Sequence, residues 1–281
     1  MAFTDNVEAD TVEADGVEAV PLLSLHKNKL HIALEDGRTI DARDLIRSET
    51  EDVLIECFEN YKGYSPPSYK SSLHLIAAMT DEEQSVILCQ ELLSKVKDAE
   101  NRERLINAAV VEDFRSGEQT FRARVAAIHI AAYNGNSGVV RLLCQEYGVD
   151  VNCSTSERTD EELLKGIAPI HLASLGGHTE VMKLLLDHKA DVNASRHTDG
   201  STPLHTAAQY GHTEVVKMLL DHKAYMDAKC TDDGSTPLYI AAWTGHTEVV
   251  KLLLDHKADV NTSCTDAVSY THLTLPTKRI V

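Results

Sequence analysis

Three nearly identical blocks recur at a fixed period in the second half of the chain. The stretch from Gly177 to Asn193 reappears with few changes from Gly211 and again from Gly245. The prolines that precede these blocks are spaced by 34 residues: Pro169, Pro203 and Pro237. Such a period is typical of stacked helical repeats, in which no unit can bury its apolar face alone. The sequence therefore predicts an array of similar units stacked in a row.

The residues of one block explain how a unit folds. Pro203 suits the first turn of a short helix, because the N–H that proline lacks would be unpaired there. Ala207 and Ala208 are small enough for the next unit to pack closely, and Gly211 ends the helix. A second helix follows, and its apolar residues form one stripe: Val215, Val216, Leu219 and Leu220. A loop containing Asp, Gly and Ser then leads to the next unit.

Two stretches of this unit resemble the ankyrin repeat. They are Thr202-Pro203-Leu204-His205-Thr206-Ala207-Ala208 and Gly245-His246-Thr247-Glu248-Val249-Val250-Lys251-Leu252-Leu253-Leu254. Looser copies lie upstream, over 127–152 and over 72–108. The longer spacing between these copies predicts extended finger loops near 109–125 and 153–166. The resemblance implies an all-α ankyrin-repeat solenoid of about five repeats, built from helix-turn-helix units with finger loops.

Four parts of the chain are expected. They are a disordered acidic tail over 1–20, a small N-terminal segment over 21–66, the repeat array over 67–266 and a non-native tail over 267–281. The last part is set apart because the repeat stays in register through Asp266 and then stops abruptly. The resulting expectation is that the native chain continues past residue 266 with sequence not seen here.

The N-terminal segment allows two interpretations. Residues 28–41 alternate around Glu35-Asp36-Gly37, which favours a β-hairpin followed by a helix over 42–60. The stretch from Leu30 to Ala33, followed by Gly37, also resembles a degenerate repeat. The hairpin is favoured slightly over the repeat.

The net charge of −17 narrows the choice of partner. Residues 125–266 carry nineteen acidic side chains against eleven basic ones, and such a surface repels the phosphates of a nucleic acid. This acidic surface favours a protein partner with a basic face. The alternative is that part of the charge serves solubility. No run of apolar residues approaches the length of a membrane span, and the N-terminus has no features of a signal peptide. We therefore expect an intracellular, cytoplasmic monomer.

We expect no catalytic residue, no bound cofactor and no metal site. None of the local motifs for phosphate loops, zinc proteases, serine hydrolases or calcium loops occurs. Ten of the fourteen histidines fall into three repeated columns, of which His188, His222 and His256 close the second helix. The resemblance implies that the column of His74, His129, His171 and His205 bonds to loop backbone. The column of His178, His212 and His246 is expected to cap or flank the second helix. Equivalent histidines on stacked helices lie too far apart to share one zinc ion.

One feature departs from the family that the chain resembles. Ankyrin repeats place a glycine after the second helix, where φ is positive, whereas three repeats of this chain place a lysine there: Lys189, Lys223 and Lys257. A left-handed lysine costs about 1 kcal/mol relative to glycine. Either the turn differs from that of the family, or the array tolerates this cost three times.

The expected binding surface lies where the repeats differ from one another. The resemblance implies that the variable residues before each turn glycine face a concave groove: Tyr133, Asn134, Leu175, Gln209, Tyr210, Trp243 and Thr244. Finger-loop residues are expected to form a weaker polar rim: Arg196, His197, Lys229 and Asp232. Exposed Trp and Tyr side chains often carry much of the energy of an interface. The alternative is that these side chains fill exposed positions or pad the core.

These features predict a non-catalytic adaptor or scaffold that binds a partner protein through this groove and these loops. The alternative is that the repeats are the targeting or regulatory region of a longer, truncated enzyme or channel. One fold serves many functions, so the resemblance does not name the partner.

Deleting residues 267–281 should leave the free energy of unfolding and the helical content unchanged, because this segment continues no repeat. Urea titration followed by circular dichroism measures both. A clear loss of cooperativity would mean that the tail packs on the array.

Overall fold

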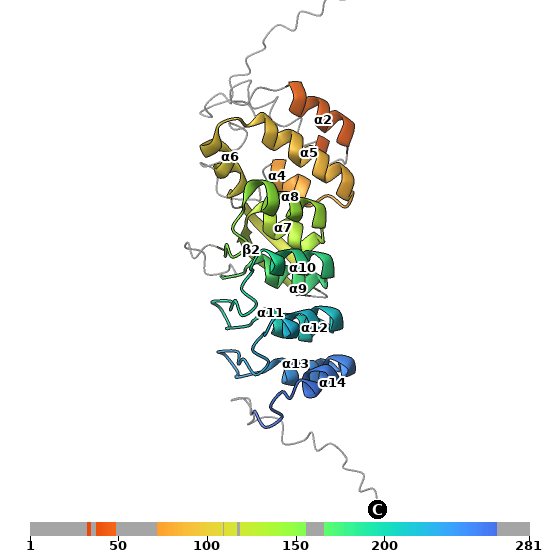
Figure 1. Ribbon diagram of the computed structural model, residues 1–281, viewed down its shortest axis with the longest axis vertical. Helices are drawn as coiled ribbons and strands as arrows, with labels where there is room; N and C mark the ends of the chain where they lie inside the picture. Colours follow the sequence, from red (N-terminus) through yellow and green to blue (C-terminus); the bar gives the residue numbers. More distant parts are fainter. Residues whose placement is uncertain are drawn as a thin grey trace, which may run out of the picture.

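The computed structural model describes residues 33–34, 38–48, 72–108, 110–116, 119–155 and 166–262, with the backbone alone for 110–116 and 119–124. Figure 1 shows an elongated stack in which the helical pairs follow one another in chain order. The loops between pairs project to one side of the stack. The predicted all-α solenoid is confirmed.

In the part of the chain that the structure describes, five helical pairs form the array. The first helix of each pair is α4 (Ser72–Ala77), α7 (Ala127–Asn134), α9 (Pro169–Gly176), α11 (Pro203–Tyr210) or α13 (Pro237–Thr244). The second is α5 (Glu82–Lys95), α8 (Ser137–Tyr147), α10 (Thr179–Asp187), α12 (Thr213–Asp221) or α14 (Thr247–Asp255). An additional helix, α6 (Ala99–Ile106), follows α5. First helices pack on first helices and second helices on second helices, so one apolar core runs along the whole array.

The finger loop before α7 is a two-stranded antiparallel hairpin. Strand β1 (Val110–Ser116) pairs with β2 (Gln119–Val125), in a register that places Val110 opposite Val125 and Ser116 opposite Gln119. The prediction of an extended loop near 109–125 thus corresponds to a regular element. Within the second long loop, residues 156–165 lie outside the described part of the chain.

The hairpin predicted over 28–41 is wrong wherever the structure describes that stretch. Ala33 and Leu34 are helical and buried, and α2 (Thr39–Ser48) begins before the predicted hairpin would end. Helix α2 packs against α5, as each second helix packs against the next one. Its apolar residues Ala42 and Ile46 are buried. This arrangement favours the alternative of a degenerate repeat, because burial against α5 outweighs the local alternation of polar and apolar residues.

Two polar contacts recur at each junction between later repeats. The histidine that follows each turn glycine bonds through Nε2 to a backbone carbonyl of the preceding repeat: His178 to Tyr133 at 2.8 Å, His212 to Leu175 at 3.1 Å and His246 to Gln209 at 2.9 Å. These rings make no bond that caps their own helices. The prediction that they cap or flank the second helix holds for their place, because each is the N-cap residue, but their side chains tie adjacent repeats together instead of capping.

The second recurring contact lies at the turn after the second helix. Asn152 Oδ1 accepts a hydrogen bond from Asp191 N at 2.7 Å, and Asn193 Oδ1 accepts one from Tyr225 N at 2.8 Å. These asparagines begin Asn-x-Ser/Thr sequences, but their amide groups are engaged in holding the next repeat. Each junction thus has a polar contact at both ends of the second helix.

All three lysines after the second helices adopt the left-handed conformation. Their φ angles are 65° at Lys189, 66° at Lys223 and 69° at Lys257. Gly148 holds the same place after α8 with φ of 59°, and a Cβ added to it would meet nothing within 4 Å. The turn is therefore that of the family, and the array tolerates the backbone cost at three positions.

Replacing Lys189→Gly together with Lys223→Gly should raise the free energy of unfolding by about 1–2 kcal/mol, because glycine adopts positive φ without steric cost. Urea denaturation measures the change. As the converse control, Gly148→Lys should lower the free energy of unfolding by about 1 kcal/mol. Equal urea midpoints for the unaltered chain, the double lysine variant and Gly148→Lys would show that the positive φ at this position does not affect the free energy of unfolding.

Candidate protein-binding groove

A groove of about 420 Å³ lies between the last two repeats. One side is formed by two consecutive finger loops, which contribute Arg196, Asp199, Asp232 and Asp233. The other side is formed by first helices, which contribute Gln209, Tyr239, Ile240, Trp243 and Thr244. Acidic and aromatic side chains therefore line the same cavity.

The aromatic side of the groove is a stacked pair on α13. The rings of Tyr239 and Trp243 lie one turn apart, with centroids 6.5 Å apart and planes 14° from parallel. Trp243 is 57% exposed and Tyr239 is 36% exposed. Large aromatic surface that stays open to solvent is typical of the central contacts of protein interfaces.

The expected binding residues occupy the last turns of successive first helices and the finger loops between them. The groove brings together Arg196, Gln209, Asp232, Trp243 and Thr244. Six others do not line it: Tyr133, Asn134, Leu175, Tyr210, His197 and Lys229. Tyr133 and Tyr210 are half-buried, unlike Trp243, so the aromatic side chains expected in this surface are not equally available to a partner. The Tyr210 ring lies 6.3 Å from that of His212.

Seven residues that line the groove were not among the predicted binding residues: Asp199, Ser201, Cys230, Asp233, Ser235, Tyr239 and Ile240. Tyr239 replaces the buried histidine of the earlier repeats, and that substitution was the available signal. Asp233 gave no signal, because loop positions carry no packing pattern. Its carboxylate accepts hydrogen bonds from both Ser235 N and Ser235 Oγ, and the side-chain bond lowers the pKa of Asp233.

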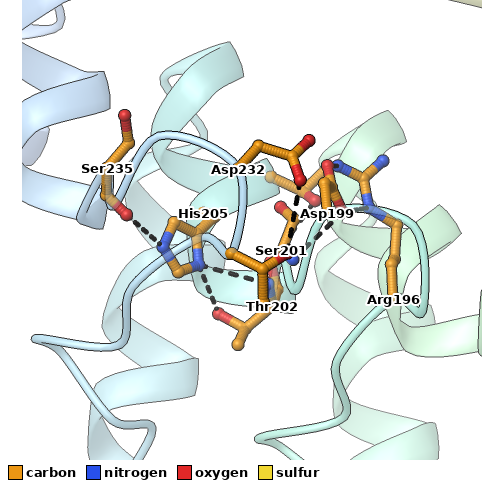
Figure 2. Close-up of polar contacts among 9 residues, drawn as sticks. Arg196, Asp199, Ser201, Thr202, His205, Asp232 and Ser235 are labelled. Carbon is orange, nitrogen blue, oxygen red and sulfur yellow. Dashed lines mark hydrogen bonds and ion pairs between the residues drawn. The ribbon is translucent and has the colours of Figure 1, made fainter. Parts of the chain in front are cut away.

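The finger loops are fixed by contacts within and between them (Figure 2). Arg196 forms an ion pair with Asp199 in its own loop, and Asp199 O accepts a hydrogen bond of 2.8 Å from Thr231 N in the next loop. The pairing leaves Arg196 largely neutralised within the groove. Asp232 and Asp233 form no ion pair with a lysine or arginine among the described residues, so the groove has a negative balance.

His205 joins the base of one loop to the next repeat (Figure 2). Its Nδ1 accepts a hydrogen bond from Thr202 N at 3.1 Å, and its Nε2 lies 3.2 Å from Ser235 O. This arrangement requires a neutral ring with the proton on Nε2, which donates to the carbonyl. His74 and His129 contact Val125 O and Ile167 O in the same way, both at 3.1 Å. The predicted bond between this column and loop backbone is therefore observed for these three rings.

His171 is the exception within this column. Its Nδ1 accepts from Ala168 N at 3.2 Å, but its Nε2 has no hydrogen-bond partner of normal geometry in the described residues. The backbone carbonyl of Ser201 stands where Ser235 O stands for His205, and its proximity raises the pKa of His171. Burial outweighs this effect and lowers the pKa of His171 to about 4. Burial likewise lowers the pKa of His129 to about 4 and lowers that of His205.

The groove contains no activated nucleophile. Cys230 lines it and is half-buried, and burial raises the pKa of its thiol to about 11. The thiol therefore stays protonated near neutral pH and is a poor nucleophile. In the ranges that the structure describes, no group of three or more His, Cys, Asp or Glu side chains could hold a metal ion. Over the same ranges no helix is long and apolar enough to cross a membrane.

The free energy of unfolding should fall as the pH is lowered from about 6.5 to 4. In this window the unfolded chain protonates His129 and His171 while the folded chain does not, so acid favours the unfolded state. Each ring contributes on the order of 1–3 kcal/mol across the window. Urea midpoints measured at several pH values test this dependence.

A variant pair isolates the contribution of one ring. His129→Gln should be less stable at neutral pH but should show a shallower pH dependence, by up to about 1.4 kcal/mol per pH unit. His256→Gln, which removes an exposed ring at the end of α14, is the matched control. Identical slopes for His129→Gln and the unaltered chain would mean that the buried ring titrates normally.

Comparison with known proteins agrees with this architecture. A family model described as "Ankyrin repeats (3 copies)" matches residues 30–196, 128–230 and 170–264. E3 ubiquitin-protein ligase XBAT32 from Arabidopsis thaliana is 36% identical over 93 residues, which cover 27% of this chain and 18% of that protein. Delta-latroinsectotoxin-Lt1a from Latrodectus tredecimguttatus is 36% identical over 70 residues, which cover 25% of this chain and 5% of that protein. These matches span small parts of much longer relatives.

The family matches together extend from residue 30 to residue 264, and the described residues show the corresponding helical pairs, left-handed turns and finger loops. The two overlapping matches after residue 128 include the repeats that form the groove. Ankyrin repeats are protein–protein interaction modules, and this chain belongs to the ankyrin-repeat family.

Proposed function

We propose that this chain is a non-catalytic adaptor that binds a partner protein through the groove between its last two repeats and the adjoining finger loops. The observation that carries the proposal is the exposed stack of Tyr239 and Trp243 in a cavity that acidic loop residues also line. A stack of this kind supplies apolar contact area on a rigid helix. The repeat array holds the helix and the loops in fixed positions before a partner arrives, which lowers the entropic cost of binding.

The charges of the groove favour a partner segment with a basic side chain. Asp232 and Asp233 carry negative charge, while the one arginine of the groove is paired with Asp199. A guanidinium group could stack on Trp243 and form an ion pair with a loop carboxylate. Contacts between a cation and an aromatic face contribute about 0.5–2 kcal/mol, depending on how far they are desolvated. The acidic balance of the whole array would accelerate the approach of such a partner.

A second candidate function is that the array targets or regulates a longer enzyme or channel. It is favoured by the comparison with relatives, in which the matched stretch is 18% or 5% of a longer protein. An intact transcript read beyond codon 266 distinguishes this candidate from an independent adaptor. Both candidates use the same groove.

Trp243→Ala should weaken partner affinity by at least about 2 kcal/mol, with little change in thermal midpoint, because the ring is exposed. Trp243 is also the single tryptophan of the chain, so its fluorescence reports on this groove alone. An arginine-containing peptide should change this fluorescence saturably, whereas the same peptide with citrulline should bind at least about tenfold more weakly. The loss of partner affinity is measured by capturing a partner with the full chain and then titrating it. The difference between the arginine and citrulline peptides is measured by fluorescence titration.

Matched variants separate the groove from the rest of the surface. Tyr225→Ala removes an exposed aromatic ring outside the groove, and Asp259→Asn removes an exposed acid outside it. Both should bind as the unaltered chain does, whereas Asp232→Asn should bind the arginine peptide more weakly. Equal capture by folded Trp243→Ala would remove the groove from the proposal. Equal binding of the arginine and citrulline peptides would remove the basic partner alone.

A further inference from the structure

The hairpin of β1 and β2 carries a free strand edge on a fixed base. Val125, at the end of β2, is fully buried, and His74 Nε2 lies 3.1 Å from Val125 O. Among the residues that the structure describes, neither strand pairs with a third one. In an antiparallel pair, alternate residues of an edge strand direct their backbone N–H and C=O groups away from the partner strand. Such an edge can receive one more extended segment.

The two faces of the hairpin differ in charge. The register places Asp113 opposite Arg122, and residues two apart along a strand share a face. One face, the arginine face, therefore holds three bases and one acid: Arg115, Arg122, Arg124 and Asp113. The opposite face, the apolar face, holds Phe114 opposite Phe121 and also Ala123.

The two edges of the hairpin are not equivalent. On the arginine face, β2 contributes Arg122 and Arg124, whereas β1 contributes Arg115 together with Asp113. A segment added beside β2 would therefore have two positive neighbours on that face. A segment added beside β1 would have neighbours whose charges cancel. The edge of β2 thus favours an extended segment with acidic residues at alternate positions.

A segment with this alternation occurs near the N-terminus of the same chain. Residues 1–20 contain six acids and no lysine or arginine, and the stretch Val-Glu-Ala-Asp occurs at 7–10 and again at 12–15. If extended, each stretch would place its valine and alanine on one face and its two acids on the other. The stretches recur after five residues, an odd number, so one straight strand would place the acids of successive stretches on opposite faces. One stretch at a time therefore fits the edge.

We propose that the free edge of β2 is a docking site for one Val-Glu-Ala-Asp stretch of the chain's own N-terminal segment. The stretch adds as a third strand, with its acids on the arginine face and its valine and alanine on the apolar face. Glu8 and Asp10 are two residues apart, as are Arg122 and Arg124, so one register matches both acids to both bases. This proposal does not depend on the function of the groove.

The connecting chain is long enough for this docking. Residues 11–32 join Asp10 to Ala33, and an extended chain of that length spans about 70 Å. From α2 to β2 the array runs through α5, α4 and α7, which pack one on the next, and three such steps amount to about 30 Å.

The tether also compensates for the weak affinity of a short strand. A flexible tether gives an effective concentration on the order of 1 mM, so a stretch with a Kd of about 1 mM is docked about half of the time. The second stretch competes for the same edge and raises its occupancy.

The test compares the full chain with a variant whose tail has the same composition and charge but lacks the alternation. Exchanging each Glu-Ala pair of residues 7–20 turns Val-Glu-Ala-Asp into Val-Ala-Glu-Asp: Glu8→Ala, Ala9→Glu, Glu13→Ala, Ala14→Glu, Glu18→Ala and Ala19→Glu. Backbone amides of 119–125 on the free edge should exchange about twofold to fivefold more slowly in the unaltered chain, as docking for about half to four-fifths of the time implies. Hydrogen exchange followed by mass spectrometry measures the rates, and α10 should exchange equally in both chains. The difference should vanish in 1 M salt, where charges are screened beyond about 3 Å.

A second pair of chains tests the arginines. With Arg122→Glu and Arg124→Glu in both, the two tails should give the same exchange, and any loosening of the hairpin cancels from this comparison. Equal exchange for the two tails on the unaltered hairpin would overturn the proposal, as would a difference that persists undiminished without the arginines. Slowing that grows with protein concentration would also overturn it, and would assign the edge to the tail of a second copy of the chain.

Discussion

The structure depends on the close packing of one repeat against the next. Each unit is a pair of short helices, which could not bury its apolar stripe without neighbours. Small residues such as Ala208 let the first helices approach, and each turn glycine leaves space for an imidazole ring. The histidine after the turn then bonds to the carbonyl of the preceding repeat. Shape and polar contacts therefore act together at every junction between the later repeats.

The same packing produces the groove. Because first helices stack in register, the variable residues on their last turns lie in neighbouring positions along one face. The buried histidines hold the finger loops against the following repeat, as His205 does through Ser235. These rings stay neutral because burial lowers their pKa values. The buried rings thus hold the finger loops, which carry the acidic residues of the groove, in place. Acid favours unfolding because these rings can take up a proton only in the unfolded chain.

The proposed function needs no chemistry from the groove. Its thiol is held protonated by burial, and its one arginine is neutralised by Asp199. What remains is an aromatic stack and two carboxylates that line the same cavity, and the proposed partner segment with apolar and basic character rests on these groups. The three left-handed lysines have an unfavourable backbone conformation that the array tolerates. Each backbone cost is about 1 kcal/mol, which the shared core of the array can offset.

The sequence alone determined the class of fold, the period and the order of the helices, because a 34-residue repeat with one apolar stripe has few other ways to bury itself. It also indicated correctly that the Pro-Leu-His column would contact loop backbone. Tertiary structure decided what local pattern could not. Residues 33–34 and 39–48 are helical because they pack in the array, although their alternation favoured a hairpin. His178, His212 and His246 bond to the preceding repeat rather than capping their own helices, a choice that depends on a glycine far away in sequence. Trp243 is 57% exposed while Tyr210 is half-buried, although both lie on the last turns of first helices, because the Tyr210 ring lies beside that of His212 and side-chain packing of this kind is not written in the repeat pattern.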